Sequence, residues 1–305
     1  MKGIRVLSLL DKEMNAKIGK KGAPGDITIY SYKQGDVAVE LIEPTLYPEK
    51  IHPLIFGLAL SDFILFKPDL ASKELGEMLA ALIITGKPGA IVGDAGAIAA
   101  YIKGSPLAQW EILDDDAIKV REKLLGVQNN WTEGKVKINI DQVFSLKSIG
   151  VVVLGAISSG TIKVHDKLTM FPINAPVEVK SLQLHDANVE EISDGSRVGA
   201  NIKGLEADKI ERGYVLGNEM RSGKQFTAQV KCPAFIKDGI SKERKIFVYV
   251  GLQYSEATLS ADIPAGGSER VEITCEKNYA YESGDMVFLV DPGRKPKIIG
   301  TGRII

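Results

Sequence analysis

At 305 residues, with 45% hydrophobic and 25% charged side chains, the chain has an ordinary globular composition and enough length for two or three domains. The formal net charge of −1 excludes a strongly basic nucleic-acid-binding protein, so an RNA partner would need a local basic surface. The sequence has no apolar run of about 18 residues and no signal-peptide pattern at its first residues, which predicts a soluble, cytoplasmic protein without membrane association.

Strands and helices alternate over the first part of the chain. The predicted strands are 3–10, 27–33, 37–42, 63–66, 90–92 and 110–113, and the predicted helices are 11–18, 54–60, 72–85, 95–102 and 114–125. Strands separated by helices of this length indicate a mainly parallel sheet covered on both faces. We therefore predict an α/β domain over residues 1–126.

The pattern changes after Gly126, where helical periodicity ends. Short strands with Gly, Asn or Asp turns fill two blocks, residues 133–217 and 223–305, with a joint near 221–224. Repeated short strands at this spacing are typical of β-barrels. The sequence therefore predicts one α/β domain followed by two all-β domains.

Short sequence motifs, most of them containing glycine, recur through both β blocks. They lie at 143–168, 177–185, 194–199, 210–216, 226–230 and 298–304. Glycine is favoured where a turn needs positive φ or where two backbones approach closely, so these motifs inform the fold more than the chemistry.

Together, these motifs and the domain order resemble the translational GTPases, which include elongation factors Tu and 1-alpha and the selenocysteine-specific factor. Residues 19–22 and 26–30 are most similar to archaeal members near the selenocysteine-specific branch. The resemblance spans nearly the whole chain. It implies an α/β degenerate P-loop GTPase-like domain followed by two all-β barrels, which correspond to domains 2 and 3 of elongation factor Tu.

The phosphate-binding loop of such a GTPase, G-x-x-x-x-G-K-[ST], is not found in this sequence. The nearest match, at residues 19–21, would put Met14 in place of the first glycine and Lys21 in place of the hydroxyl residue. The connection after the first strand is short and contains Asp11, whose charge would repel phosphates.

The family's D-x-P-G-H motif is also replaced. Glu43 and Asp62 have the spacing that the resemblance implies for elongation factor 1-alpha, which puts Leu46 at the glycine and Tyr47 at the catalytic histidine. Leu46 keeps a backbone N–H that could meet a γ-phosphate, whereas Tyr47 cannot orient a water as histidine does. Glu43 without its partners is not expected to hold a metal.

The guanine-reading motif N-K-x-D is reduced to its last residue. Asp94 occupies the Asp position, and we expect it to cap the following helix. Glu43, Leu46, Tyr47 and Asp94 are therefore vestigial nucleotide-site positions. The sequence predicts no catalytic residue, no metal and no cofactor; GTP with Mg²⁺ belongs only to the alternative of an atypical but functional site.

The remaining reactive side chains give no catalytic pattern. Cys232 and Cys275 are predicted to be buried or idle thiols, and His52, His165 and His185 to be surface or structural histidines. In the resemblance, the stretch 197–203 lines the groove that holds the end of tRNA. Arg197 and Lys203 are therefore the candidates for RNA phosphate contacts, with a solvated barrel strand as the alternative.

These observations predict a translation-associated, elongation-factor-like protein that binds the ribosome or tRNA, and other translation proteins, without hydrolysing GTP. Two alternatives stay open at this point. One is a functional GTP-binding elongation factor of the selenocysteine-specific type with an unusual site. The other is a protein-binding scaffold outside translation.

Overall fold

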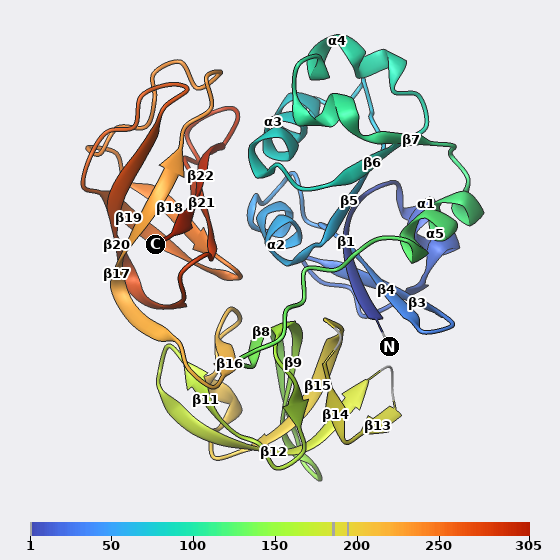
Figure 1. Cartoon of the computed structure of the whole chain (residues 1–305), viewed down its shortest axis with the longest axis vertical. Coiled ribbons are helices and arrows are strands. Elements are labelled where there is room, and N and C mark those ends of the chain that lie inside the picture. The colour runs from blue at the N-terminus through green and yellow to red at the C-terminus, as the bar shows by residue number, and fades with distance from the viewer. Residues whose placement is uncertain (1, 185–186, 194) are drawn as a thin grey trace. The chain divides into compact units, whose positions relative to one another are not determined.

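The computed structural model describes residues 2–184, 187–193 and 195–305 and divides into two compact units (Figure 1). The first comprises Met1–Asn129 and Gly293–Ile298, and the second Asn130–Pro292 and Ile299–Ile305. His185 and Asp194 lie outside the described residues. Because the second unit contains both β domains, the boundaries 1–126, 133–217 and 223–305 stay a prediction.

A seven-stranded sheet forms the centre of the first unit, in the order β2-β3-β4-β1-β5-β6-β7. Strands β4, β1, β5, β6 and β7 run parallel, and β2 and β3 add an antiparallel edge. The bounds are β1 Lys2–Leu9, β2 Lys20–Lys21, β3 Thr28–Gln34, β4 Val37–Glu43, β5 Phe63–Phe66, β6 Gly89–Val92 and β7 Glu111–Leu113. The predicted parallel strands are confirmed. β2 was not predicted, since two exposed lysines carry no strand periodicity.

Helices cover this sheet and bury its apolar strands. They are α1 Lys12–Ile18, α2 His52–Leu60, α3 Leu75–Thr85, α4 Ala99–Ile102 and α5 Ala117–Leu125, with 3-10 segments η1 Gly96–Ile98 and η2 Pro106–Gln109. Helices α1 and α5 lie on one face of the sheet, and α2 and α3 lie on the other (Figure 1). This arrangement puts the ends of the parallel strands beside the first turns of the helices that follow them.

Three predicted helices differ from the structure for local reasons. The helix predicted at 72–85 begins only at Leu75, because Ser72 Oγ accepts from the Glu74 N–H at 3.2 Å and forms a turn there. The helix predicted at 95–102 is a 3-10 segment followed by a single α-turn. The helix predicted at 114–125 begins at Ala117, after Asp116 caps the Ile118 and Lys119 N–H groups.

A closed barrel of six strands follows, in the order β11-β16-β8-β9-β15-β12 with β12 pairing back to β11. These strands are β8 Lys137–Leu146, β9 Gly150–Ser159, β11 Lys167–Phe171, β12 Ala175–Leu184, β15 Arg197–Lys203 and β16 Val215–Gly217. The shorter β10 Ile162–Lys163, β13 Ala187–Val189 and β14 Glu191–Ile192, with the 3-10 segment η3 Ala207–Lys209, lie around it. Trp131 packs against the core of this first barrel, and its Nε1 donates to the Gly160 carbonyl at 3.0 Å.

The C-terminal strands close a second barrel, in the order β17-β20-β19-β18-β21-β22. Its strands are β17 Arg221–Lys231, β18 Ile246–Val250, β19 Gln253–Leu259, β20 Ser268–Tyr281, β21 Met286–Val290 and β22 Ile298–Ile304. Cys232 and Cys275 are free thiols in its core, as predicted, and burial raises the pKa of Cys275 to about 12. The predicted fold class, an α/β domain followed by two all-β barrels, is confirmed. None of the helices within the described residues is long and apolar enough to cross a membrane.

A candidate ligand cavity at the strand ends

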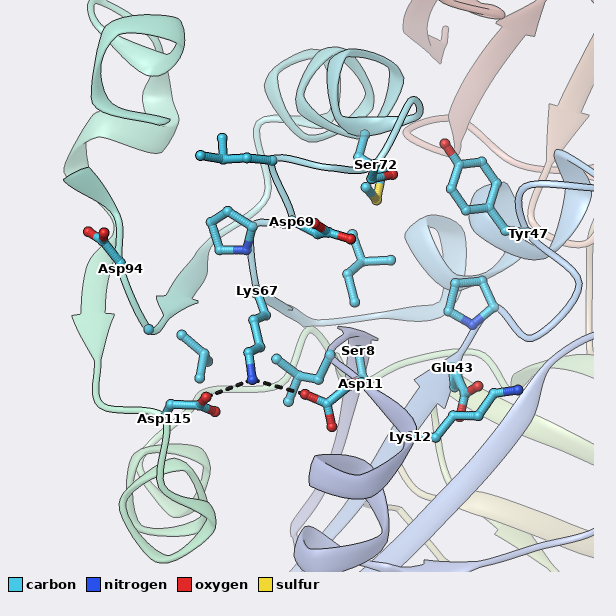
Figure 2. Close-up of a pocket in the computed structure, with 18 of the residues that line it drawn as sticks. Ser8, Asp11, Lys12, Glu43, Tyr47, Lys67, Asp69, Ser72, Asp94 and Asp115 are labelled. Carbon is cyan, nitrogen blue, oxygen red and sulfur yellow. Dashed lines mark hydrogen bonds and ion pairs between the residues drawn. The ribbon is translucent and has the colours of Figure 1, made fainter. Parts of the chain in front are cut away.

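A cavity of about 910 Å³ opens at the carboxyl ends of the parallel strands of the first unit (Figure 2). Residues that follow β1, β4, β5 and β6 line it, together with Asp115 ahead of α5. Open parallel sheets bind ligands at this edge, because the loops after the strands meet there. The cavity is therefore the candidate functional site.

The connection between β1 and α1 consists of Leu10 and Asp11 alone. Asp11 caps α1: its Oδ1 accepts from the Met14 N–H at 2.8 Å, and its Oδ2 accepts from Lys67 Nζ at 2.9 Å. The hydrogen bond from Met14, followed by that from Lys67, holds the pKa of Asp11 below its ordinary value. A carboxylate of the chain thus occupies the helix N-terminus, where an anionic ligand would otherwise be favoured.

Lys67 follows β5 and joins two helix beginnings. Its Nζ lies 2.9 Å from Asp11 Oδ2 and 2.6 Å from Asp115 Oδ2, so the ammonium bridges the start of α1 and the loop before α5 (Figure 2). The hydrogen bonds to Asp115 and then Asp11 raise the pKa of Lys67. Lys67 is therefore charged at neutral pH and is held by side chains of the chain itself.

Glu43 ends β4 as a buried carboxylate, with 7% of its surface exposed. Its Oε2 accepts from Asn15 Nδ2 at 3.5 Å, and Asn15 is in turn positioned by a 2.6 Å hydrogen bond from Ser8 Oγ. Burial, followed by the contact with Glu43, raises the pKa of Tyr30 to about 12. No ion pair joins Glu43 to a cationic side chain within the described part of the chain.

The segment after β4 departs from one expectation of the sequence. The Leu46 N–H, which was expected to be available to a phosphate, donates to the Asp26 carbonyl at 3.1 Å. Tyr47 does line the cavity, and its buried hydroxyl has no hydrogen-bond partner among the described residues. Burial, then the charges of Glu77 and Glu74, raise the pKa of Tyr47 far above its ordinary value. Tyr47 is thus a neutral phenol at physiological pH.

Asp94 lies after β6 at the rim of the cavity and is exposed. Its Oδ1 accepts from the Gly96 N–H at 2.8 Å, at the first residue of the 3-10 segment. This contact spans two residues and forms a local turn, whereas the N-cap position of the 3-10 segment is Ala95 and has no side-chain cap, so Asp94 does not cap a helix as the sequence predicted. The structure thus brings Glu43, Tyr47 and Asp94 to one cavity.

Lys67 and Asp69 were missed as site residues. They follow the buried strand β5 directly, and polar residues after a parallel strand are a usable signal for a site at this edge of a sheet. Within the described ranges, no group of three or more His, Cys, Asp or Glu side chains is arranged to hold a metal ion.

The two RNA candidates lie on β15 of the first barrel, in the other unit. Arg197 makes a bidentate ion pair, with Nε 2.8 Å from Asp141 Oδ2 and Nη2 2.6 Å from Asp141 Oδ1. Lys203 is exposed and lies across from Glu178 on β12. A role of either residue in binding RNA stays a prediction.

Replacing Asp11 by Asn tests the electrostatic part of this arrangement. Asn keeps an acceptor for the Met14 N–H but loses the charge that Lys67 meets, so we expect a loss of at most about 1 kcal/mol at pH 7 for these solvent-accessible groups. Because the native pKa of Asp11 lies below 3.8, the wild-type advantage is present above that pH and lost as the pH falls through the native pKa. Urea denaturation of the wild type and of Asp11→Asn between pH 2 and 7 measures the difference in their free energies of unfolding. A difference that stays constant down to pH 2 would contradict a stabilising role of the Asp11 charge.

Comparison with known proteins gives a consistent set of relatives. A family model described as elongation factor Tu domain 2 matches residues 150–217. An uncharacterised protein of Methanocaldococcus jannaschii is 36% identical over 296 residues, which is 94% of each chain. The selenocysteine-specific elongation factor of the same organism is 28% identical over 192 residues, 56% of this chain and 41% of that factor.

The solved structures agree in fold. The translation elongation factor SelB of Methanococcus maripaludis, in complex with a GTP analogue, superposes with a TM-score of 0.83 at 21% identity. The match covers 99% of this chain and 78% of that chain. The same domain order therefore extends through the whole length of the chain.

Proposed function

Because this chain belongs to the translational GTPase family, we propose that it acts in translation as a binding protein that does not hydrolyse GTP. The observation that carries this proposal is the occupation of the α1 N-terminus by Asp11, whose carboxylate is also paired with Lys67. A nucleotide would have to displace the capping carboxylate and bring its phosphates into a cavity that contains five carboxylates.

Each nucleotide-binding element supports the same proposal separately. The first connection has two residues in place of a phosphate loop. The Leu46 N–H is already hydrogen-bonded, and Tyr47 replaces a general base. Asp94 has lost the Asn and Lys that would accompany it in a guanine site. Without a γ-phosphate to order or release these loops, regulation would come from binding partners.

The proposed partner is the ribosome or tRNA, bound through the first barrel. Arg197 is held by Asp141, so any phosphate contact of β15 would fall mainly to the exposed Lys203. Binding carried by phosphate contacts weakens steeply as salt rises. Other translation proteins are further candidate partners of the same barrels.

Co-sedimentation with ribosomes across a salt series, without nucleotide and with GTP or GDP, tests the proposal. We expect association at low salt that is equal in the three nucleotide conditions. Lys203→Glu should weaken it more than Lys209→Glu, a matched reversal at another exposed lysine of the same barrel. Association that requires GTP would favour a functional GTPase, and no association at low salt would favour a scaffold outside translation.

A further inference from the structure

The strand-end cavity has an excess of negative charge. Its lining holds five carboxylates and two lysines: Asp11, Glu43, Asp69, Asp94 and Asp115, with Lys12 and Lys67. Such a lining repels anions and raises the local concentration of cations. The net charge of the lining therefore favours a cation over an anion.

The cavity already binds one ammonium group, that of the chain's own Lys67. This group lies between Asp11 Oδ2 and Asp115 Oδ2, at 2.9 and 2.6 Å (Figure 2). The pairing of Lys67 with two carboxylates thus shows how side chains at this edge of the sheet bind a primary ammonium group.

Glu43 is a further carboxylate in the cavity, and it has no ammonium partner. It is 7% exposed, it contacts the neutral Asn15 amide and Tyr30 hydroxyl, and no ion pair to it occurs among the described residues. A buried carboxylate without a counter-ion is costly, and a ligand cation would remove that cost. Lys12 is drawn beside Glu43 in Figure 2 but forms no ion pair with it.

Much of the rest of the lining is apolar. Leu9, Leu10, Leu70, Met78 and Val92 contribute to it, and Leu70 is 57% exposed. Methylene groups would bury this surface, whereas a hydrated divalent cation would not. The described residues also offer no cluster of metal ligands. The apolar walls and the buried carboxylate together fit an organic cation with an aliphatic stem.

We propose that this cavity binds a primary alkylammonium group, anchored by Glu43, from a free aliphatic polyamine or from a lysine side chain of a protein partner. The inference rests on the proposed loss of nucleotide binding, since both ligands would use the same edge of the sheet. Under this proposal, a cationic ligand binds at the edge of the sheet where the related GTPases would bind an anionic nucleotide.

Calorimetric titration of the full chain with spermidine, and separately with a lysine-rich peptide, tests the inference. Glu43→Gln keeps the size and hydrogen-bonding capacity of the side chain and removes its charge. It should weaken binding at least about tenfold. The matched control Glu269→Gln, on an exposed position of β20, removes the same charge outside the cavity and should leave the affinity unchanged. If Glu43→Gln does not fold, Asp69→Asn, which removes another carboxylate of the cavity, is tested in its place, and we expect a smaller loss of affinity.

The outcomes separate the sources and the rival explanations. Spermidine binding that depends on Glu43 identifies a free polyamine, and peptide binding alone with the same dependence identifies a partner's lysine. Equal weakening by Glu43→Gln and Glu269→Gln, displacement by an equal concentration of MgCl₂, or no binding of either ligand would overturn the inference. If any of these results is found while ribosome association is intact, the inference fails and the proposed function is unaffected. Saturable GTP binding would contradict both the inference and the proposed function.

Discussion

Asp62→Ala should lower the free energy of unfolding of the first unit by about 3–5 kcal/mol. Asp62 is 1% exposed and accepts three hydrogen bonds from Arg5: from the backbone N at 3.0 Å, from Nε at 3.3 Å and from Nη2 at 3.1 Å. Arg5 is 4% exposed on the central strand β1, so the substitution would bury a guanidinium that has lost its main carboxylate.

Guanidinium chloride denaturation followed by circular dichroism measures this effect. Glu49→Ala, at an exposed position of the same unit, is the control and should change stability by less than about 0.5 kcal/mol. The double variant Arg5→Met, Asp62→Leu should recover much of the loss, because it removes both charges and keeps the volume filled. A cost for Asp62→Ala as small as that of the control would show that the pair does not matter for stability.

Gly302→Ala is expected to have the next largest effect, in the second barrel. A Cβ at this position would lie 2.3 Å from the Gln229 carbonyl oxygen and 2.9 Å from Val230 Cα, both backbone atoms of β17. Backbone atoms paired in a closed barrel cannot move aside as a flexible side chain can, so β22 and β17 must separate. We expect a loss of about 3 kcal/mol.

Gly223→Ala provides the matched control. Gly223 lies on β17, the strand that Gly302 approaches, and a Cβ at Gly223 would meet no atom closer than 3.9 Å. Hydrogen exchange of the β17 and β22 amides, measured for both variants, follows the barrel directly. Faster exchange in Gly302→Ala alone is the expected result. Unchanged protection in that variant would mean that the strands tolerate the extra carbon.

Much of the fold could be predicted from the sequence because its signals are local. Buried runs such as Phe63–Phe66 give the parallel strands, and glycines such as Gly302 mark where barrel backbones approach closely. β2 escaped prediction because its pairing with β3 depends on the hairpin partner rather than on its own two lysines. The start of α3 shifted because a hydroxyl forms a turn that periodicity does not reveal.

The candidate site was predicted only in part. Glu43, Tyr47 and Asp94 could be placed by the spacing of replaced motifs, and all three line the cavity. The bridge from Lys67 to Asp11 and Asp115 joins residues that are distant in sequence, and no motif relates them. The ion pair of Arg197 with Asp141 likewise depends on the barrel, which brings β15 and β8 side chains together.

The most direct measurement is a calorimetric titration of the full chain with GTP and with GDP, each with and without Mg²⁺. Because Asp11 caps α1 and pairs with Lys67 where we propose that phosphates would have to bind, we expect no saturable heat at nucleotide concentrations up to about 1 mM. Saturable binding of either nucleotide at micromolar concentration would contradict the central claim that side chains of this protein have replaced the nucleotide.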